Sequence, residues 1–138
     1  MKTTFSIFTL LLLINFCRAG DITLDTFTDV DSHGTSEFVF NISEARLDSQ
    51  PAWTPGEQPV PLGIDKALQI AQAWIQKQSW SKRFESFHQI TLEHQNCWFY
   101  YIDLKVRDHH SDESPAAVMV LLDGSVVEPQ LKPPAGSK

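Results

Sequence analysis

Residues 64–78 read IDKALQIAQAWIQKQ, and this stretch decides the fold. Its apolar side chains recur at steps of three and four: Ile64, Ala67, Leu68, Ala71, Trp74 and Ile75. This spacing lines one face of an amphipathic helix, while polar residues fill the other face. A helix with one apolar face must pack on a partner, and the strand-like segments downstream are the only large apolar partner. We therefore expect an α+β fold in which one amphipathic helix, ending between Gln78 and Ser81, packs on a four- or five-stranded antiparallel sheet.

The strands of this sheet are predicted from alternation of apolar and polar residues and from one wholly apolar run. They are residues 37–43, 88–94, 97–107, 116–122 and 125–128. In the longest strand one face is apolar throughout, whereas the other carries Phe99 and Tyr101 at one end and charges at the other. We expect the N-terminal segment or a partner to cover these two aromatic residues. The pair Asp123-Gly124 predicts a hairpin turn before the last strand.

The N-terminus has the pattern of a secretory signal peptide over residues 1–19. A basic start and a long apolar run lead to a cleavage position after Ala19. A lipoprotein signal with Cys17 as the lipidated residue is the alternative, although Phe16 does not fit the small residue that such processing requires. Both alternatives predict a secreted or periplasmic protein, and cleavage after Ala19 leaves no stable membrane insertion.

The remaining chain divides by composition into three parts, one of which contains a distinct loop. They are an acidic N-terminal arm (20–35), a single α+β domain (36–129) with a Pro-rich loop inside it (48–63), and a flexible tail (130–138). Residues 21–31 are compatible with a frayed first strand or a disordered arm. The Pro-rich loop should lack regular structure, and its Trp53 is predicted to hold the loop on the domain, because a large aromatic ring is unfavourable in water.

Charge and cysteine content restrict the possible partners. The whole chain has a formal net charge of −6, and removal of the signal leaves nine Lys and Arg against seventeen Asp and Glu. Such a surface repels nucleic acid and favours solubility or a basic partner. Cys97 would then be the only cysteine, so no internal disulfide is expected and its thiol is predicted to be a small buried group. Because the last strand is short and ends at Pro129, we expect a monomer in dilute solution.

Several segments together resemble the PepSY domain, a small extracytoplasmic module. They are Ala67-Leu68-Gln69-Ile70-Ala71 in the helix, Tyr100-x-Ile102-x-Leu104 in the central strand, and residues 120–127 around the turn. The resemblance covers about residues 62–128 and implies a modulator of peptidases or of another envelope protein. Asp123 is followed directly by Gly124, whereas the family usually has Asp-x-x-Thr-Gly. A cystatin-like fold is the second resemblance, although its inhibitory loop motif is absent.

One loop contains a cluster of residue types that bind metals. It holds Asp108, His109, His110, Asp112 and Glu113. Imidazole nitrogens and carboxylate oxygens suit zinc or copper, but ordering a flexible loop costs backbone entropy, so a solvated acidic loop is the alternative. The sequence shows no catalytic motif. We therefore expect a noncatalytic binding or regulatory module with a protein partner and no cofactor, and a metal-binding envelope protein is the alternative.

Overall fold

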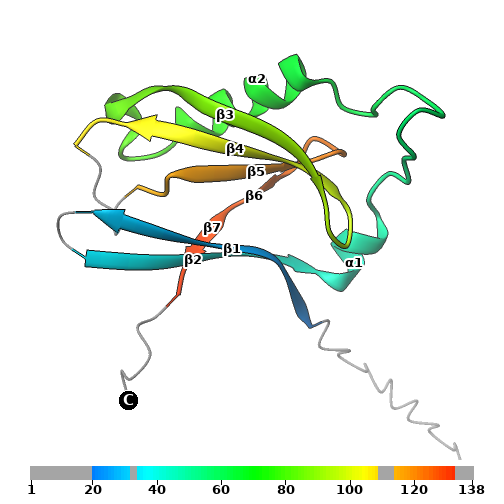
Figure 1. The fold of residues 1–138 in the computed structure, drawn as a ribbon, viewed down its shortest axis with the longest axis horizontal. Coiled ribbons are helices and arrows are strands. Elements are labelled where there is room, and N and C mark those ends of the chain that lie inside the picture. Colours follow the sequence, from blue (N-terminus) through cyan, green and yellow to red (C-terminus); the bar gives the residue numbers. More distant parts are fainter. Residues whose placement is uncertain (1–19, 32–33, 109–113, 133–138) are drawn as a thin grey trace, which may run out of the picture.

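The computed structural model describes residues 20–31, 34–108 and 114–132. These residues form two antiparallel sheets and one longer helix, so the predicted α+β class is confirmed. The helix α2 covers one face of a four-stranded sheet, and a three-stranded sheet covers the opposite face (Figure 1). The protein is therefore built in three layers, of which the sequence predicted the first two. The assignment of residues 37–43 to the sheet under the helix is wrong, because they lie in the three-stranded sheet.

The helix α2 spans Ile64–Ile75 and begins where the periodicity predicts. Asp65 in the first turn places a negative charge near the positive end of the helix dipole. The predicted end between Gln78 and Ser81 is wrong. After Ile75 the amides of Lys77 and Gln78 bond three residues back rather than four, so the chain tightens into turns and leaves the helix.

The four-stranded sheet, here called the helix-facing sheet, has the order β3-β4-β5-β6. Its strands are β3 (Phe84–His94), β4 (Trp98–Val106), β5 (Ala117–Leu121) and β6 (Val126–Val127). A short 3₁₀ helix, Ser81–Arg83, leads into β3. The predicted Asp123-Gly124 turn is confirmed, because the Gly124 amide bonds to the carbonyl of Leu121 and Gly124 has φ 85°, a conformation that favours glycine.

The core between the helix and this sheet contains the apolar face that the periodicity predicted, except for Ile64, which stands at the first helical position and is 47% exposed. Its buried residues are Ala67, Ala71, Trp74, Ile75, Trp80, Tyr100, Ile102, Leu104, Val118, Val120 and Leu122. All five residues of β5 are buried, because the helix covers one face of this strand and the second sheet covers the other. The wholly apolar sequence of β5 thus follows from its central position.

The three-stranded sheet, here called the outer sheet, has the order β1-β2-β7. It is formed by β1 (Asp21–Asp31), β2 (Gly34–Ser43) and β7 (Pro129–Leu131). Of the two alternatives for the N-terminal segment, the strand is correct, and the separate arm over residues 20–35 is therefore wrong. The predicted tail is also wrong at its start, because the chain crosses between sheets at Glu128 and Pro129 pairs with Phe40. The pairing with β5 ends at Val127, and Pro129 does not end strand structure, since an edge position tolerates its missing N–H.

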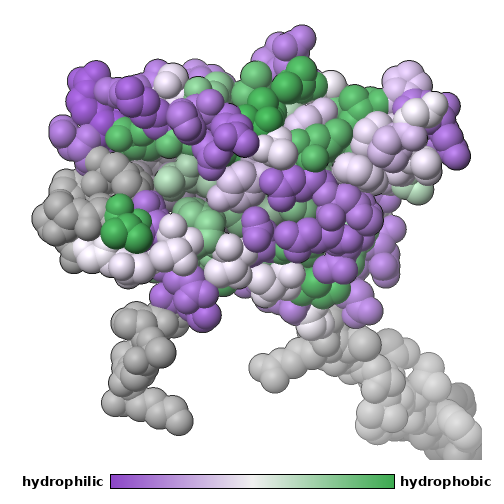
Figure 2. All heavy atoms as spheres, viewed as in Figure 1, coloured by the Kyte–Doolittle hydropathy of each residue, from purple (hydrophilic) through white to green (hydrophobic). Residues whose placement is uncertain are grey.

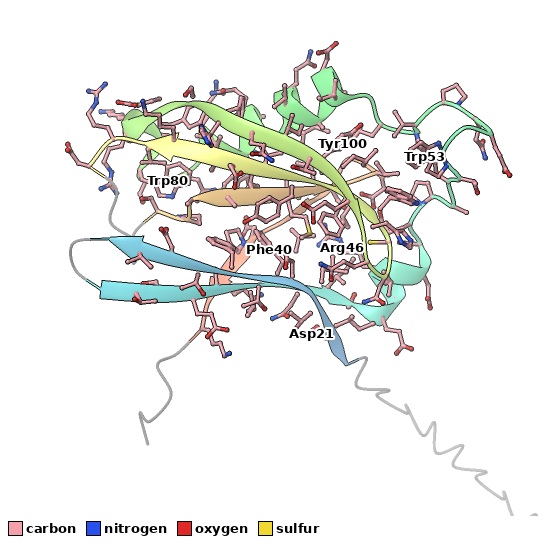
Figure 3. The ribbon with its side chains drawn as sticks, viewed as in Figure 1. Asp21, Phe40, Arg46, Trp53, Trp80 and Tyr100 are labelled. Carbon is pink, nitrogen blue, oxygen red and sulfur yellow. The ribbon has the colours of Figure 1, made fainter. Side chains whose placement is uncertain are left out.

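A second core lies between the two sheets. Its buried residues are Leu24, Phe40, Ile42, Cys97, Phe99, Ala117, Met119, Leu121 and Val127, and Tyr101 packs against them. Phe40 projects into the space between the sheets (Figure 3) and meets the Tyr101 ring edge to face at 6.0 Å. From β1, Leu24 is buried in the same core and Phe27 meets the Tyr101 ring edge to face at 6.4 Å. Of the two expected covers for Phe99 and Tyr101, the N-terminal segment or a partner, the N-terminal segment is therefore present.

A five-residue helix, α1 (Glu44–Asp48), connects β2 to the Pro-rich loop and was not predicted. The Ser43 hydroxyl caps it by accepting a hydrogen bond from the Arg46 amide at 3.3 Å. The Arg46 guanidinium donates to the carbonyl of Val126 at 2.9 Å, which ties α1 to the helix-facing sheet. After Asp48 the loop is irregular, as predicted. Within the described residues no helix has the length and apolar character needed to cross a membrane.

Candidate functional site

The predicted metal loop falls largely outside the part of the chain that the structure describes. Asp108 is exposed and has a positive φ of 46°, whereas His109, His110, Asp112 and Glu113 lie outside the described residues. Among the described residues, no three His, Cys, Asp or Glu side chains are grouped so that they could hold a metal ion. The metal site at this loop therefore stays a prediction.

A cleft of about 280 Å³ lies between the Pro-rich loop and the turn that joins β3 to β4. We call it the aromatic cleft, and it is lined by Leu47, Gln50, Pro51, Ala52, Trp53, Thr54, His94, Asn96, Cys97 and Trp98. The loop supplies one wall and the β3–β4 hairpin supplies the other. In Figure 3 the label of Trp53 shows where the aromatic cleft lies.

Three rings form the aromatic part of the cleft. Trp53 and Trp98 have ring centroids 4.9 Å apart at an interplanar angle of 72°, and His94 lies 4.8 Å from Trp98 at 47°. The Trp53 indole also donates to the carbonyl of Gln58 at 2.8 Å. These contacts confirm that Trp53 holds the loop on the domain. Trp98, which the alternation placed wholly in the core, is only partly buried and borders the cleft.

The floor of the cleft contains an amide and a thiol. The Gln50 Nε2 donates to Asp123 Oδ2 at 2.8 Å and to the Arg46 carbonyl at 3.1 Å. The Gln50 Oε1 is buried and has no hydrogen-bond partner in the described structure. Cys97 is buried, and burial followed by the negative charge of Asp123 raises the pKa of its thiol. The thiol is therefore held in its neutral form, which makes it a poor nucleophile.

The aromatic cleft is electrically neutral in an acidic protein. None of its ten lining residues is Asp, Glu, Lys or Arg. Asp123 lies just behind the floor. Although burial acts to raise the pKa of Asp123, hydrogen bonds from Ser125 and Gln50 lower this pKa overall, so the carboxylate is ionised and occupied by its own partners. Hence the cleft offers aromatic surface, amides and a hydroxyl to a ligand, and no net charge.

A second cleft, of about 240 Å³, lies where α2 ends beside β7. It is lined by Phe38, Trp74, Gln78, Trp80, Pro115, Glu128, Pro129 and Leu131. Trp80 marks its position, at the opposite end of the view from Trp53 (Figure 3). Trp74 and Trp80, the two tryptophans of this second cleft, are at most 9% exposed. The Trp74 indole donates a hydrogen bond to the Glu128 carboxylate at 2.9 Å. Because the rings of both tryptophans belong to the core, this cleft presents less aromatic surface than the aromatic cleft.

Acidic side chains surround Tyr101 where β1 meets the helix-facing sheet. Burial, and then the negative charges of Asp103, Asp25, Glu93 and Asp29, raise the pKa of the Tyr101 phenol. Burial, and then Asp25 and Asp103, raise the pKa of Glu93, and burial also raises that of Asp103. This group of carboxylates makes stability depend on pH. The face of the molecule drawn in Figure 2 shows hydrophobic residues in groups among hydrophilic ones.

Comparison with known proteins gives no relative: no family model, no curated protein and no solved structure matches this chain. The resemblance to the PepSY domain therefore stays a prediction. Evidence on function comes from the residues themselves, and among the described clefts the aromatic cleft combines partly exposed rings with exposed polar side chains.

Proposed function

We propose that the protein is a secreted or periplasmic, noncatalytic binding module and that the aromatic cleft is its recognition site. The observation that carries this proposal is the open cleft in which Trp53, Trp98 and His94 converge. Binding sites are typically concave, rich in aromatic side chains and provided with a few polar groups that orient the ligand. Tryptophan is also enriched among the residues that contribute most to binding.

The partner that we propose is a protein of the envelope or of the extracellular space. The excess of acidic side chains disfavours nucleic acid and favours a partner with a neutral or basic surface. The PepSY-like pattern supports a regulatory role, such as modulation of a peptidase. Support for a noncatalytic role comes from Cys97, since burial raises the pKa of the one nucleophilic thiol in the cleft.

The test uses exposed cleft residues, so that the fold is preserved. His94 and Asn96 are both exposed, and His88 is an exposed histidine on the same strand as His94 but outside the cleft. The mature protein, the double variant His94→Ala/Asn96→Ala and the control His88→Ala are immobilised and incubated with native envelope or secretome extract. We expect the same proteins to be recovered by the wild type and the control, and to be depleted with the double variant.

Two results would contradict the proposal. Equal recovery by the wild type and the double variant would remove the aromatic cleft as the recognition site. Hydrolysis of a substrate panel by the pure protein, without any reproducible capture, would replace the binding module by an enzyme.

A further inference from the structure

The neutrality of the aromatic cleft restricts the ligand class. A charged group in a partly desolvated site requires an opposite charge, because burying an unpaired charge is costly. The lining offers none. Phosphate, carboxylate and ammonium groups are therefore poor ligands for this cleft, although the acidic surface elsewhere would attract cations. The ligand that fits is neutral.

The three rings indicate that this neutral ligand has an apolar face. The Trp53 and Trp98 planes meet at 72°, so the rings form a corner rather than a parallel slot. A small ring can rest on one indole face while its rim contacts the other. The volume of about 280 Å³ lies just below the usual range for drug-sized ligands, about 300–1,000 Å³. This space suits one ring unit rather than a long chain.

The polar groups indicate that the ligand donates hydrogen bonds. The Gln50 Oε1 has no hydrogen-bond partner among the described residues but is buried, so a ligand in the open cleft contacts the exposed polar side chains instead. Of these, Thr54 and Asn96 have groups that both donate and accept. A proline-rich peptide, the other common occupant of aromatic grooves, offers mainly carbonyl acceptors because proline has no N–H. A ligand rich in hydroxyl groups can both donate to and accept from Thr54 and Asn96, whereas a proline-rich segment offers few donors.

We infer that the aromatic cleft receives one neutral sugar unit, carried by the partner, with its C–H face on the indole rings and its hydroxyl groups on Asn96 and Thr54. This inference rests on the proposed binding function and names the ligand class of the same site. A pyranose without acidic or basic substituents combines the required neutrality, the apolar face and the donor hydroxyls.

The experiment titrates the full mature protein with four probes: fully N-acetylated chitotriose, maltotriose, cellotriose and a proline-rich decapeptide. Binding is followed by tryptophan fluorescence and by calorimetry. We expect saturable binding of at least one oligosaccharide, weakened at least about tenfold in His94→Ala/Asn96→Ala and unchanged in His88→Ala. The variant Gln50→Glu, which places a charge at the floor of the cleft, should weaken the binding of the same oligosaccharide.

Each other outcome overturns a defined part of the inference. If no oligosaccharide shows saturable binding up to about 10 mM, the inference of a sugar ligand is wrong. Saturable binding of the decapeptide would then identify the ligand as a peptide and leave the proposed binding function intact. If an oligosaccharide binds equally to the wild type and the double variant, the aromatic cleft is not its site. If no probe binds and the capture experiment also shows no dependence on the cleft, the proposed function fails together with the sugar.

Discussion

Phe40→Ala tests whether the outer sheet is a structural layer on which the rest of the fold depends. Phe40 is fully buried between the sheets and contacts the rings of Phe27 and Tyr101 at 5.6 and 6.0 Å. A buried aromatic side chain removes about 200 Å² from water, which at ~25 cal/mol per Å² gives an upper bound of about 5 kcal/mol. Since alanine keeps part of that contact and leaves a cavity, we expect a loss of about 3–5 kcal/mol in the free energy of unfolding.

Urea unfolding followed by tryptophan fluorescence provides the assay. The four tryptophans, at positions 53, 74, 80 and 98, all lie outside the outer sheet, so their signal reports on the other two layers. The matched control is Val39→Ala, the next residue on β2, which is only partly buried and should cost less than about 1 kcal/mol. If Phe40→Ala leaves the fluorescence midpoint unchanged, or if both variants cost the same, the outer sheet does not stabilise the helix-facing sheet and the three-layer reasoning fails.

Three further predictions concern pH, metal and assembly. Because the pKa values of Glu93 and Asp103 are raised in the folded state, the folded protein binds protons more tightly, so their contribution to stability should fall as pH rises from about 4 through the folded pKa values. When thermal unfolding is measured at a series of pH values, the midpoint temperature should fall less with rising pH in Glu93→Gln than in the wild type. Identical pH profiles for the two proteins would refute this. If the loop 108–113 is a metal site, calorimetric titration with zinc and copper at neutral pH should show binding. This binding should disappear in the double variant His109→Ala/His110→Ala and below about pH 6.5, and equal titrations of the two proteins would make it a solvated loop. Light scattering should give a monomer in dilute solution, and a concentration-independent dimer would contradict this.

The pattern of alternation explains which elements could be predicted from the sequence. The helix α2 and the inward face of β2 follow from unbroken periodicity. The strand β1 was ambiguous because a register shift between Thr23 and Asp25 puts Leu24 and Phe27 out of phase. Two similar irregularities in the first half of β3 explain why that strand was predicted to begin only at His88. Alternation also cannot assign a strand to one of two sheets, so the second sheet stayed hidden.

The aromatic cleft was only half predictable for a different reason. Trp53 was singled out because a large ring in a polar loop needs a contact. Its partner Trp98 lies in a strand where every second residue was assigned to the core, and nothing local shows that this end of the strand borders a cleft. The unpaired Oε1 of Gln50 depends on contacts with distant residues, which pattern analysis does not provide.

The way the Pro-rich loop is attached suggests that the aromatic cleft is already formed before a ligand arrives. Trp53 fixes the loop at its middle, and the Tyr100 hydroxyl donates to the carbonyl of Leu62 at 2.7 Å near its end. Prolines at 51, 55, 59 and 61 reduce the number of conformations that the loop can adopt, so less entropy is lost when it is ordered. A lid that opened would have to break the Trp53 contacts and expose that ring to water. The loop therefore forms the second wall of a cleft that is already ordered, and the proposed ligand would avoid most of the ordering cost of binding.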